Sequence, residues 1–223
     1  MREFANSTDR DGITVLLKRI GEKMETEHLP TLQDRIDFVW RQVKFYIKND
    51  AFQEGDFTLS WGLKSKYYID MANIINNPLC LPRLVELLHR EIVEIIRASQ
   101  PPNAKGEWWK EKLVGIGGVA LGGALLSHAY ASRHPYLFPF VVRIQRAELE
   151  CSPHMKPGKV LLIDDVLTTG KSLLLAKHIL NINGYEVSKA LVIVDRQEGG
   201  LEKCKGEGLE VKSFFKLSDI LEG

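Results

Sequence analysis

The sequence predicts an α/β protein built on a doubly wound parallel sheet of about five strands, preceded by a helical extension and a small hairpin. Three observations support this fold class. Short apolar runs that are typical of strands buried on both faces begin near residues 113, 138, 160, 189 and 211. Segments long enough for helices alternate with these runs, as in parallel sheets with helical crossovers. The chain has 223 residues, 44% of them hydrophobic, which is enough for one well-packed domain.

Composition limits the classes of function. The formal net charge is +1, which disfavours a dedicated nucleic-acid binder, whereas small anionic substrates need only local positive charge. The stretch Met1–Asn6 lacks the apolar segment of a signal peptide, and no apolar run is long enough to span a bilayer, so a cytoplasmic location is expected. Three widely spaced cysteines, Cys80, Cys151 and Cys204, argue against a disulfide framework or a zinc site.

Residues 1–50 are predicted to form an N-terminal helical extension, and residues 51–223 the main domain. Helices are expected at 13–27 and 32–48, and in the second one the apolar residues Ile36, Val39, Val43 and Ile47 recur on one face. No chemistry is evident in the extension. Packing against the main domain or a partner is its expected role.

The start of the main domain, 51–70, is predicted to contain two short strands joined by a turn, because glycines separate aromatic and branched residues there. A helix with an apolar stripe is expected at 77–97. The segment 99–112 contains prolines and the pair Trp108-Trp109, and is predicted to be a long loop. The tryptophans are expected to anchor this loop or to form a subunit contact.

A strand beginning at Leu113 leads into a glycine-rich turn, Ala120-Leu121-Gly122-Gly123, and a helix is expected at Ala124–Ala131. A glycine cluster is weak evidence for a ligand site by itself, since glycines also permit close packing of a helix on a strand. Because this turn lies one strand before a second predicted anion site, it is a candidate phosphate site.

The strongest signal is Val160–Ser172, where a buried strand predicted to end at Asp164 leads to two carboxylates, a hydroxyl-rich turn and a helix. We refer to Thr168–Ser172 as the cradle. A glycine-containing turn that opens a helix presents N–H groups and the positive end of the helix dipole to an anion. A nucleotide-binding P-loop is excluded, because Asp165 occupies the place of its first glycine. For each residue taken singly, capping of a turn or helix stays an alternative.

Two carboxylates beside this cradle would repel a bare phosphate, so the ligand must offer hydroxyl donors or a bound cation. A sugar phosphate with a vicinal diol, carrying Mg²⁺, meets both requirements. The string Leu162–Ser172 resembles the phosphoribosyl-pyrophosphate signature of the type I phosphoribosyltransferases. This resemblance implies that Asp164 and Asp165 bind the ribose hydroxyls and that the cradle binds the 5-phosphate. It implies no metal ligands beyond these two aspartates, because the Mg²⁺ is carried by the substrate.

The glycine-rich turn is similar to the pyrophosphate loop of the same family. The residues that the resemblance assigns to phosphoribosyl pyrophosphate are Ala120, Leu121, Gly122, Gly123, Arg143, Asp164, Asp165, Val166, Leu167, Thr168, Thr169, Gly170, Lys171 and Ser172.

Two further segments resemble the orotate phosphoribosyltransferases. Residues 57–70 are similar to a hood over the base, although Trp61 replaces the usual serine and Ser60 stands where some members carry a substrate-contacting lysine. Residues 195–198 would be a solvated strand end on residue types alone, but they are similar to a segment whose arginine binds the carboxylate of orotate. A guanidinium fork suits a planar carboxylate. The residues implied to contact the base are Tyr67, Tyr68, Thr168 and Arg196.

Residues 143–159 are polar, contain proline and show no clear periodicity, which favours a mobile lid that excludes water and brings cations to the leaving group. The family carries several basic residues here. This chain keeps Arg143, has Ile144 in place of the first lysine, and offers Arg146 and His154 as displaced candidates. An exposed loop histidine without a role is an equal alternative for His154. The resemblance implies a homodimer in which each lid reaches the neighbouring site.

Three hypotheses for function stay open. The first is transfer of ribose 5-phosphate from phosphoribosyl pyrophosphate to orotate, giving orotidine 5′-phosphate and pyrophosphate in pyrimidine biosynthesis. Asp164, Asp165 and Arg143 are then the catalytic residues, which act through their charge and not as nucleophiles. The second is a phosphoribosyltransferase for another base, suggested by Ile144. The third is a non-catalytic regulatory protein of the same fold that binds nucleic acid or a nucleotide effector, suggested by the altered lid.

Overall fold

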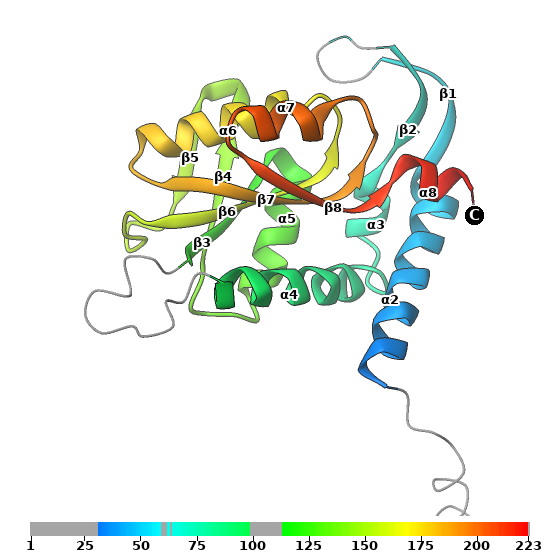
Figure 1. Cartoon of the computed structure of the whole chain (residues 1–223), viewed down its shortest axis with the longest axis horizontal. Helices are drawn as coiled ribbons and strands as arrows, with labels where there is room; N and C mark the ends of the chain where they lie inside the picture. Colours follow the sequence, from blue (N-terminus) through cyan, green and yellow to red (C-terminus); the bar gives the residue numbers. More distant parts are fainter. Residues whose placement is uncertain (1–30, 59–61, 63, 99–112, 223) are drawn as a thin grey trace, which may run out of the picture. The chain divides into compact units, whose positions relative to one another are not determined.

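The computed structural model describes residues 31–58, 62, 64–98 and 113–222 (Figure 1). The chain divides into two compact units, Met1–Phe38 and Val39–Gly223, and the second contains every element described below except the start of one helix. The helix predicted at 13–27 and the Trp108-Trp109 pair lie outside the described residues. The domain boundary predicted at residue 50 stays a prediction.

A six-stranded sheet lies at the centre of the second unit, with the strand order β5-β4-β3-β6-β7-β8. Five of the strands are parallel and correspond to the predicted apolar runs, whereas β5 pairs antiparallel with β4 at one edge. The doubly wound parallel sheet is therefore confirmed, with one added edge strand. The strands are β3 (Leu113–Val119), β4 (Phe138–Arg143), β5 (Glu148–Cys151), β6 (Lys159–Leu167), β7 (Glu186–Asp195) and β8 (Glu210–Lys216).

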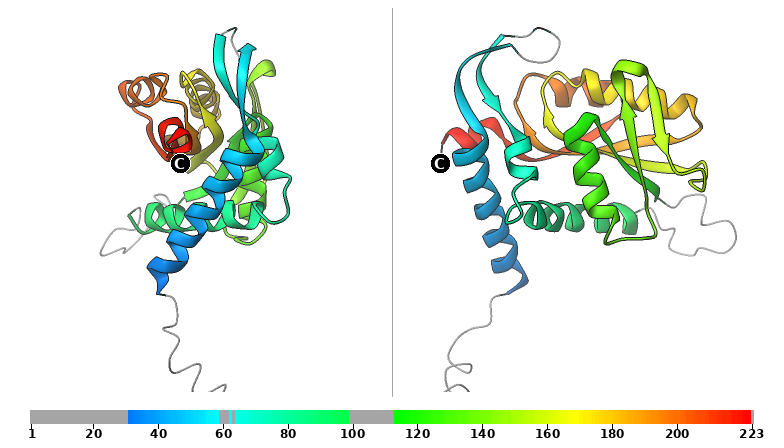
Figure 2. Two further views of the ribbon diagram at one scale, coloured as in Figure 1. Left: turned by 90° about the vertical axis from the view of Figure 1, so that its right-hand side faces the viewer. Right: turned by 180° about the vertical axis from the view of Figure 1, so that it is seen from behind.

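Helices cover both faces of this sheet (Figure 1, Figure 2). In β6, Leu161 and Ile163 are buried on one face while Val160 and Leu162 are buried on the other, as the two-residue period of a strand requires. Because both faces are covered, the strand is apolar almost throughout. The helices on the first face are α4 (Leu81–Ala98) and α5 (Ala120–Ala131), and those on the second are α6 (Lys171–Ile182) and α7 (Gly200–Gly206).

An antiparallel hairpin, β1 (Phe52–Thr58) and β2 (Lys64–Ile69), precedes the sheet and confirms the predicted pair of strands. It leads into the short helix α3 (Met71–Ile75), which the carboxylate of Asp70 caps by accepting the N–H of Ala72 at 3.2 Å. The hairpin thus stands beside the C-terminal ends of the central strands, where it borders the site described below.

The helix predicted at 32–48 is present as α2 (Leu32–Tyr46), followed by one π-helical turn (Ile47–Ala51). Within the second unit, the ring of Trp40 lies 4.5 Å from that of Phe215 in β8. This contact packs the end of α2 against β8. The last described helix is α8 (Leu217–Leu221).

Two element boundaries differ from the predictions near the site. β6 does not end at Asp164 but continues to Leu167, because its last residues still pair with β7. α5 begins at Ala120 and not at Ala124, so the glycine-rich turn is the first turn of a helix. The side chains of both aspartates therefore belong to a strand, and the glycines to a helix.

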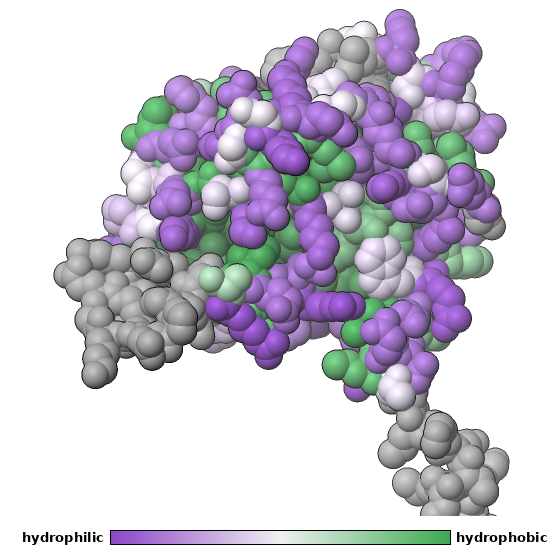
Figure 3. Space-filling model, viewed as in Figure 1, coloured by the Kyte–Doolittle hydropathy of each residue, from purple (hydrophilic) through white to green (hydrophobic). Residues whose placement is uncertain are grey.

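The face of the molecule seen in Figure 3 mixes hydrophilic and apolar residues over its whole extent. None of the described helices is long and apolar enough to cross a membrane.

Candidate functional site

A cleft of about 370 Å³ lies where the C-terminal ends of β3, β6 and β7 meet the β1–β2 hairpin. Ligands of open parallel sheets bind at this edge. The cleft is lined by Thr58, Tyr68, Ile69, Val119, Ala120, Asp164, Asp165, Val166, Thr168, Ser172 and Arg196. All of these except Thr58, Ile69 and Val119 were predicted site residues, so side chains from four separate segments come together.

The junction between β3 and α5 is unusually close. A Cβ built on Gly118 would lie 1.8 Å from the carbonyl carbon of Gly123, and one on Gly123 would lie 2.1 Å from the carbonyl oxygen of Ile163. Only glycine permits this approach. Ala120, the first helical residue, has a left-handed φ of +53°, a conformation that costs a non-glycine residue about 1–2 kcal/mol. Strain of this kind is often found where the backbone serves a ligand.

Asp164 and Asp165 form an acidic pair in the last part of β6. Asp164 is 7% exposed, and its Oδ1 accepts the N–H of Asp165 at 3.0 Å. Burial raises the pKa of Asp164 well above its ordinary value of 3.8, and the charge of Asp165 raises it further. Burial also raises the pKa of Asp165, whose Oδ1 accepts the N–H of Val166 at 2.9 Å. The pair therefore favours a ligand that brings positive charge or hydroxyl donors.

The cradle joins β6 to α6. Gly170 has a φ of +74°, and a Cβ there would lie 2.7 Å from the Sγ of Cys204, so both the conformation and the space require glycine. The buried hydroxyl of Thr169 has no hydrogen-bond partner in the described part of the chain, while Thr168 and Ser172 line the cleft. An unpaired buried hydroxyl costs about 1–3 kcal/mol, which a ligand that bonds to it would recover. Together with the first N–H groups of α6, these hydroxyls are the donors that an anion needs.

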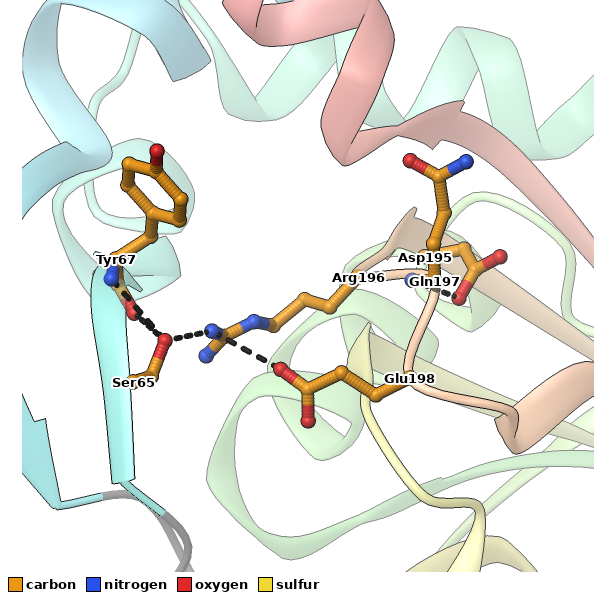
Figure 4. Close-up of polar contacts among 6 residues, drawn as sticks. All are labelled: Ser65, Tyr67, Asp195, Arg196, Gln197 and Glu198. Atoms are coloured by element: carbon orange, nitrogen blue, oxygen red, sulfur yellow. Dashed lines mark hydrogen bonds and ion pairs between the residues drawn. The ribbon is translucent and has the colours of Figure 1, made fainter.

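Arg196 directly follows β7 and extends toward β2 (Figure 4). Its side chain is only 3% exposed, yet the residue lines the cleft. The Nη2 group donates to Ser65 Oγ and lies 3.1 Å from Glu198 Oε1, whereas the buried Nε–H has no hydrogen-bond partner among the described residues. A guanidinium with an unused donor beside a cleft is suited to a planar carboxylate.

The two hood tyrosines differ in position. Tyr68 lines the cleft and is 39% exposed, with its ring 5.4 Å from that of Phe57. The structure does not bring Tyr67 into the lining, because its ring stacks on Phe52 at 5.5 Å. Neighbouring residues of a strand point to opposite faces, which accounts for the difference.

The predicted lid, 143–159, has more regular structure than expected, because it contains a short 3-10 turn (Ile144–Arg146) and the strand β5. Arg143 forms an ion pair with Glu150 of β5, in which Nε lies 2.5 Å from Oε1 and Nη2 lies 3.1 Å from Oε2. Arg146 is 4.0 Å from Glu148. His154 is exposed, and neither it nor the two arginines line the cleft.

The acidic pair supplies only part of the ligands that a divalent cation needs. In the described part of the chain, no group of three or more His, Cys, Asp or Glu side chains could hold a metal ion. Asp164 and Asp165 supply two carboxylates, whereas Mg²⁺ takes six oxygen ligands and is commonly shared with substrate phosphates. The residues present therefore fit an ion whose other ligands come from a bound substrate.

Sequence reasoning missed Ser65 and Glu198, which contact Arg196, and Thr58, which lines the cleft. Glu198 stands two positions after Arg196 in the same short string, so a local pattern could have indicated it. Ser65 lies 131 positions from Arg196, and no local pattern links residues so far apart.

A family model described as a phosphoribosyl transferase domain matches residues 117–216, which hold the α5 start, the acidic pair, the cradle and Arg196. The fold and the site thus fall in the class of phosphoribosyltransferases. The orotate phosphoribosyltransferase of Methanocella arvoryzae is 32% identical over 186 residues, which cover 80% of this chain and 95% of that protein. That of Pyrococcus abyssi is 30% identical over 189 residues, covering 81% and 93%. The chain therefore belongs to the orotate phosphoribosyltransferase family.

Solved structures have the same fold. The orotate phosphoribosyltransferase from Aeropyrum pernix superposes with a TM-score of 0.64 at 29% identity, covering 84% of this chain and 97% of that one. The Mycobacterium tuberculosis enzyme in complex with phosphoribosyl pyrophosphate gives a TM-score of 0.62 at 25% identity, covering 82% and 98%.

Proposed function

We propose that this chain transfers ribose 5-phosphate from phosphoribosyl pyrophosphate to orotate and releases pyrophosphate. The observation that carries the proposal is that the acidic pair Asp164-Asp165 and the buried Arg196 line the same cleft. Carboxylates suit the diol of a ribose, and a guanidinium suits the carboxylate of a pyrimidine. The cleft therefore has a recognition group for the donor and another for the acceptor. The names of the relatives support the same assignment.

The donor substrate is assigned to three elements. The cradle binds the 5-phosphate through the first N–H groups of α6 and the hydroxyls of Thr168, Thr169 and Ser172. Asp164 and Asp165 accept hydrogen bonds from the ribose hydroxyls. The start of α5, Ala120–Gly123, presents its unpaired N–H groups to the pyrophosphate. The remaining members of the predicted set, Val166, Leu167, Gly170 and Lys171, shape the backbone between these groups.

The substrate is expected to arrive with Mg²⁺ as its counter-ion. Burial raises the pKa values of Asp164 and Asp165, and a cation that arrived with the substrate would favour their ionised forms. Two ionised carboxylates are therefore less stable in the empty site than in the site that holds the substrate.

Three side chains are assigned to the base. Arg196 binds the carboxylate of orotate through the N–H donors that Ser65 and Glu198 do not use. Tyr68 covers the ring from the hood, and Thr168 lies on the side of the cradle. Tyr67 supports this arrangement indirectly, because its stacking on Phe52 holds β2 in place. A base without a carboxylate would leave these donors of Arg196 unpaired. The cost of the unpaired donors is the reason why the site should prefer orotate to such a base.

In the proposed reaction, the bond from ribose C1 to pyrophosphate breaks while the ring nitrogen of the base bonds to C1. Positive charge develops on the ribose beside Asp164 and Asp165, and negative charge on the pyrophosphate beside the start of α5. Each group preplaced against developing charge is worth about 3 kcal/mol in such reactions. For Arg143 to contribute, it must leave Glu150, and a solvent-exposed ion pair of this kind contributes little to stability.

The test is loss of orotate absorbance with wild-type protein, phosphoribosyl pyrophosphate and Mg²⁺. We expect turnover of orotate and none of uracil or purines at the same enzyme concentration. Faster turnover of another base would refute the choice of orotate. Binding of phosphoribosyl pyrophosphate without turnover of any base would favour the regulatory alternative, which the Arg143–Glu150 pair supports. The proposal includes a homodimer, to be measured by sedimentation, and a cytoplasmic location.

A further inference from the structure

The guanidinium of Arg196 is held through its Nη2 group (Figure 4). Both partners, Ser65 Oγ and Glu198 Oε1, contact Nη2, and the second lies at 3.1 Å. The Nε–H is buried and has no hydrogen-bond partner among the residues that the structure describes. Because the five N–H donors of a guanidinium lie in one rigid plane, anchoring Nη2 sets the direction of all the others.

The backbone of β2 sets the orientation of the Ser65 hydroxyl. Its proton is donated to the carbonyl of Tyr67 at 2.9 Å, while its oxygen accepts the N–H of Tyr67 at 3.1 Å. With its proton committed, the Ser65 oxygen is left as an acceptor for Arg196. The hood strand that carries Tyr68 is thereby joined to a residue that follows β7.

A rigid turn sets the position of Glu198. Gln197, between the two charged residues, has a left-handed φ of +60°. Its N–H donates to Asp195 Oδ1 at 2.9 Å, and its Oε1 accepts the N–H of Ser218 at 3.0 Å. These bonds hold the turn that brings the Glu198 carboxylate to the guanidinium.

The two anchors lie outside the ligand space. Arg196 lines the cleft, whereas neither Ser65 nor Glu198 does. Glu198 therefore balances the charge of the buried guanidinium from behind, which limits the cost of burying it. A ligand carboxylate in the cleft does not have to displace Glu198.

We propose that Ser65 and Glu198 are positioning residues that set the specificity for a base bearing a carboxylate. They hold Nη2 of Arg196, and so fix the plane in which the remaining N–H donors of the guanidinium meet the carboxylate of the base. This inference rests on the proposed function, because it explains how the residue that reads the base is oriented. Through Ser65, the guanidinium is aligned only when the hairpin that carries Tyr68 is in place.

Equilibrium binding of two nucleotides isolates this role from catalysis. Orotidine 5′-phosphate and uridine 5′-phosphate share the ribose and the phosphate and differ only by the carboxylate on the base. In the ratio of their dissociation constants, measured by calorimetry on the full chain, the ribose and phosphate contacts cancel. The wild type should prefer orotidine 5′-phosphate.

For Ser65→Ala and for Glu198→Ala we expect this preference to fall about tenfold, the equivalent of one charge-assisted hydrogen bond. Affinity for uridine 5′-phosphate should stay within about twofold of the wild-type value. The matched variants Ser65→Thr and Glu198→Gln keep an acceptor oxygen, and should retain most of the preference. Replacement of a residue that merely supports the fold would weaken the binding of both nucleotides and leave their ratio unchanged.

Four results would overturn the inference. The first is a ratio of the two dissociation constants near one in the wild type, and the second is an unchanged ratio in both alanine variants. The third is an increased preference for orotidine 5′-phosphate in Glu198→Ala, and the fourth is an equal loss of affinity for both nucleotides in the variants. An increase would mean that Glu198 competes with the ligand carboxylate. Absence of orotate turnover in the wild type refutes the proposed function, whereas the nucleotide preference and its response to the variants are measured without turnover.

Discussion

The carboxylate of Asp165 occupies the space that a side chain at residue 122 would need, since a Cβ built on Gly122 would fall 2.1 Å from Asp165 Oδ2. The first turn of α5 and the acidic pair of β6 are therefore in direct contact. The segment assigned to pyrophosphate and the residues assigned to ribose cannot be moved independently of each other.

Gly122→Ala should weaken the binding of phosphoribosyl pyrophosphate more than it weakens the fold. The added methyl must push the Asp165 carboxylate aside, and overpacking of this kind costs about 1–3 kcal/mol of stability. Calorimetry with the substrate and urea unfolding measure the two effects. Gly206→Ala is the control, because nothing lies within 4 Å of its Cβ and its φ is not positive. It should keep full affinity and gain about 0.5–1 kcal/mol of stability.

Asp164→Asn should make the protein more stable at neutral pH and unable to bind phosphoribosyl pyrophosphate. Burial raises the pKa of Asp164 above its ordinary value of 3.8, so at higher pH the folded state keeps a proton that the unfolded state has lost. The free energy of unfolding of the wild type therefore falls as the pH rises from about 3.8 through the folded pKa. Asparagine does not ionise and so removes this loss of stability. Stabilising substitutions of this kind commonly raise the free energy of unfolding by about 0.5–2 kcal/mol.

Urea unfolding of wild type and Asp164→Asn at several pH values measures this prediction. The stability difference should be small near pH 4, because Asp164 is then protonated in the folded protein, and should grow toward neutral pH. A constant difference at all pH values would contradict it. The double variant Asp164→Asn with Asp165→Asn should also lose substrate binding, and unchanged affinity there would refute the assignment of the ribose.

The parts of the fold that the sequence predicted well depend on local patterns. The strands β3, β6 and β7 are continuous apolar runs, and the cradle is a short string whose glycine, hydroxyls and following helix are neighbours in the chain. By contrast, β5 has four residues with two exposed glutamates, Glu148 and Glu150. Charged residues are common on edge strands, where pairing on one side suffices, so the pattern looks like a loop.

The remaining errors have long-range causes. Gly122 and Gly123 are poor helix formers, and the helix includes them because α5 must start against β3 and the carbonyl of Ile163. Likewise, the contact of Ser65 with Arg196 and the raised pKa of Asp164 exist only after folding. Residue types suggested what the site binds, whereas packing decided how its groups are oriented.

Arg196→Ala should raise the Michaelis constant for orotate about 10- to 100-fold, the equivalent of a lost hydrogen bond to a charged group. The constant for phosphoribosyl pyrophosphate should change little, because the acidic pair and the cradle stay in place. Arg196→Lys is the matched variant, and it should not restore orotate binding, since an ammonium lacks the rigid fork. Steady-state kinetics with each substrate varied in turn is the measurement. Equal effects on both substrates would remove the role assigned to Arg196.

Arg143→Ala should lower kcat about 100-fold if Arg143 leaves Glu150 to stabilise the departing pyrophosphate. The free energy of unfolding should change little, because the side chains of both residues are 50% exposed and such pairs contribute little. Arg146→Ala is the control with the same loss of charge from the same segment. Glu150→Gln should then lower the Michaelis constant for phosphoribosyl pyrophosphate, since the arginine no longer has to break an ion pair. If Arg143→Ala and Arg146→Ala have equal and small effects on kcat, the lid of this chain supplies no cation to the leaving group.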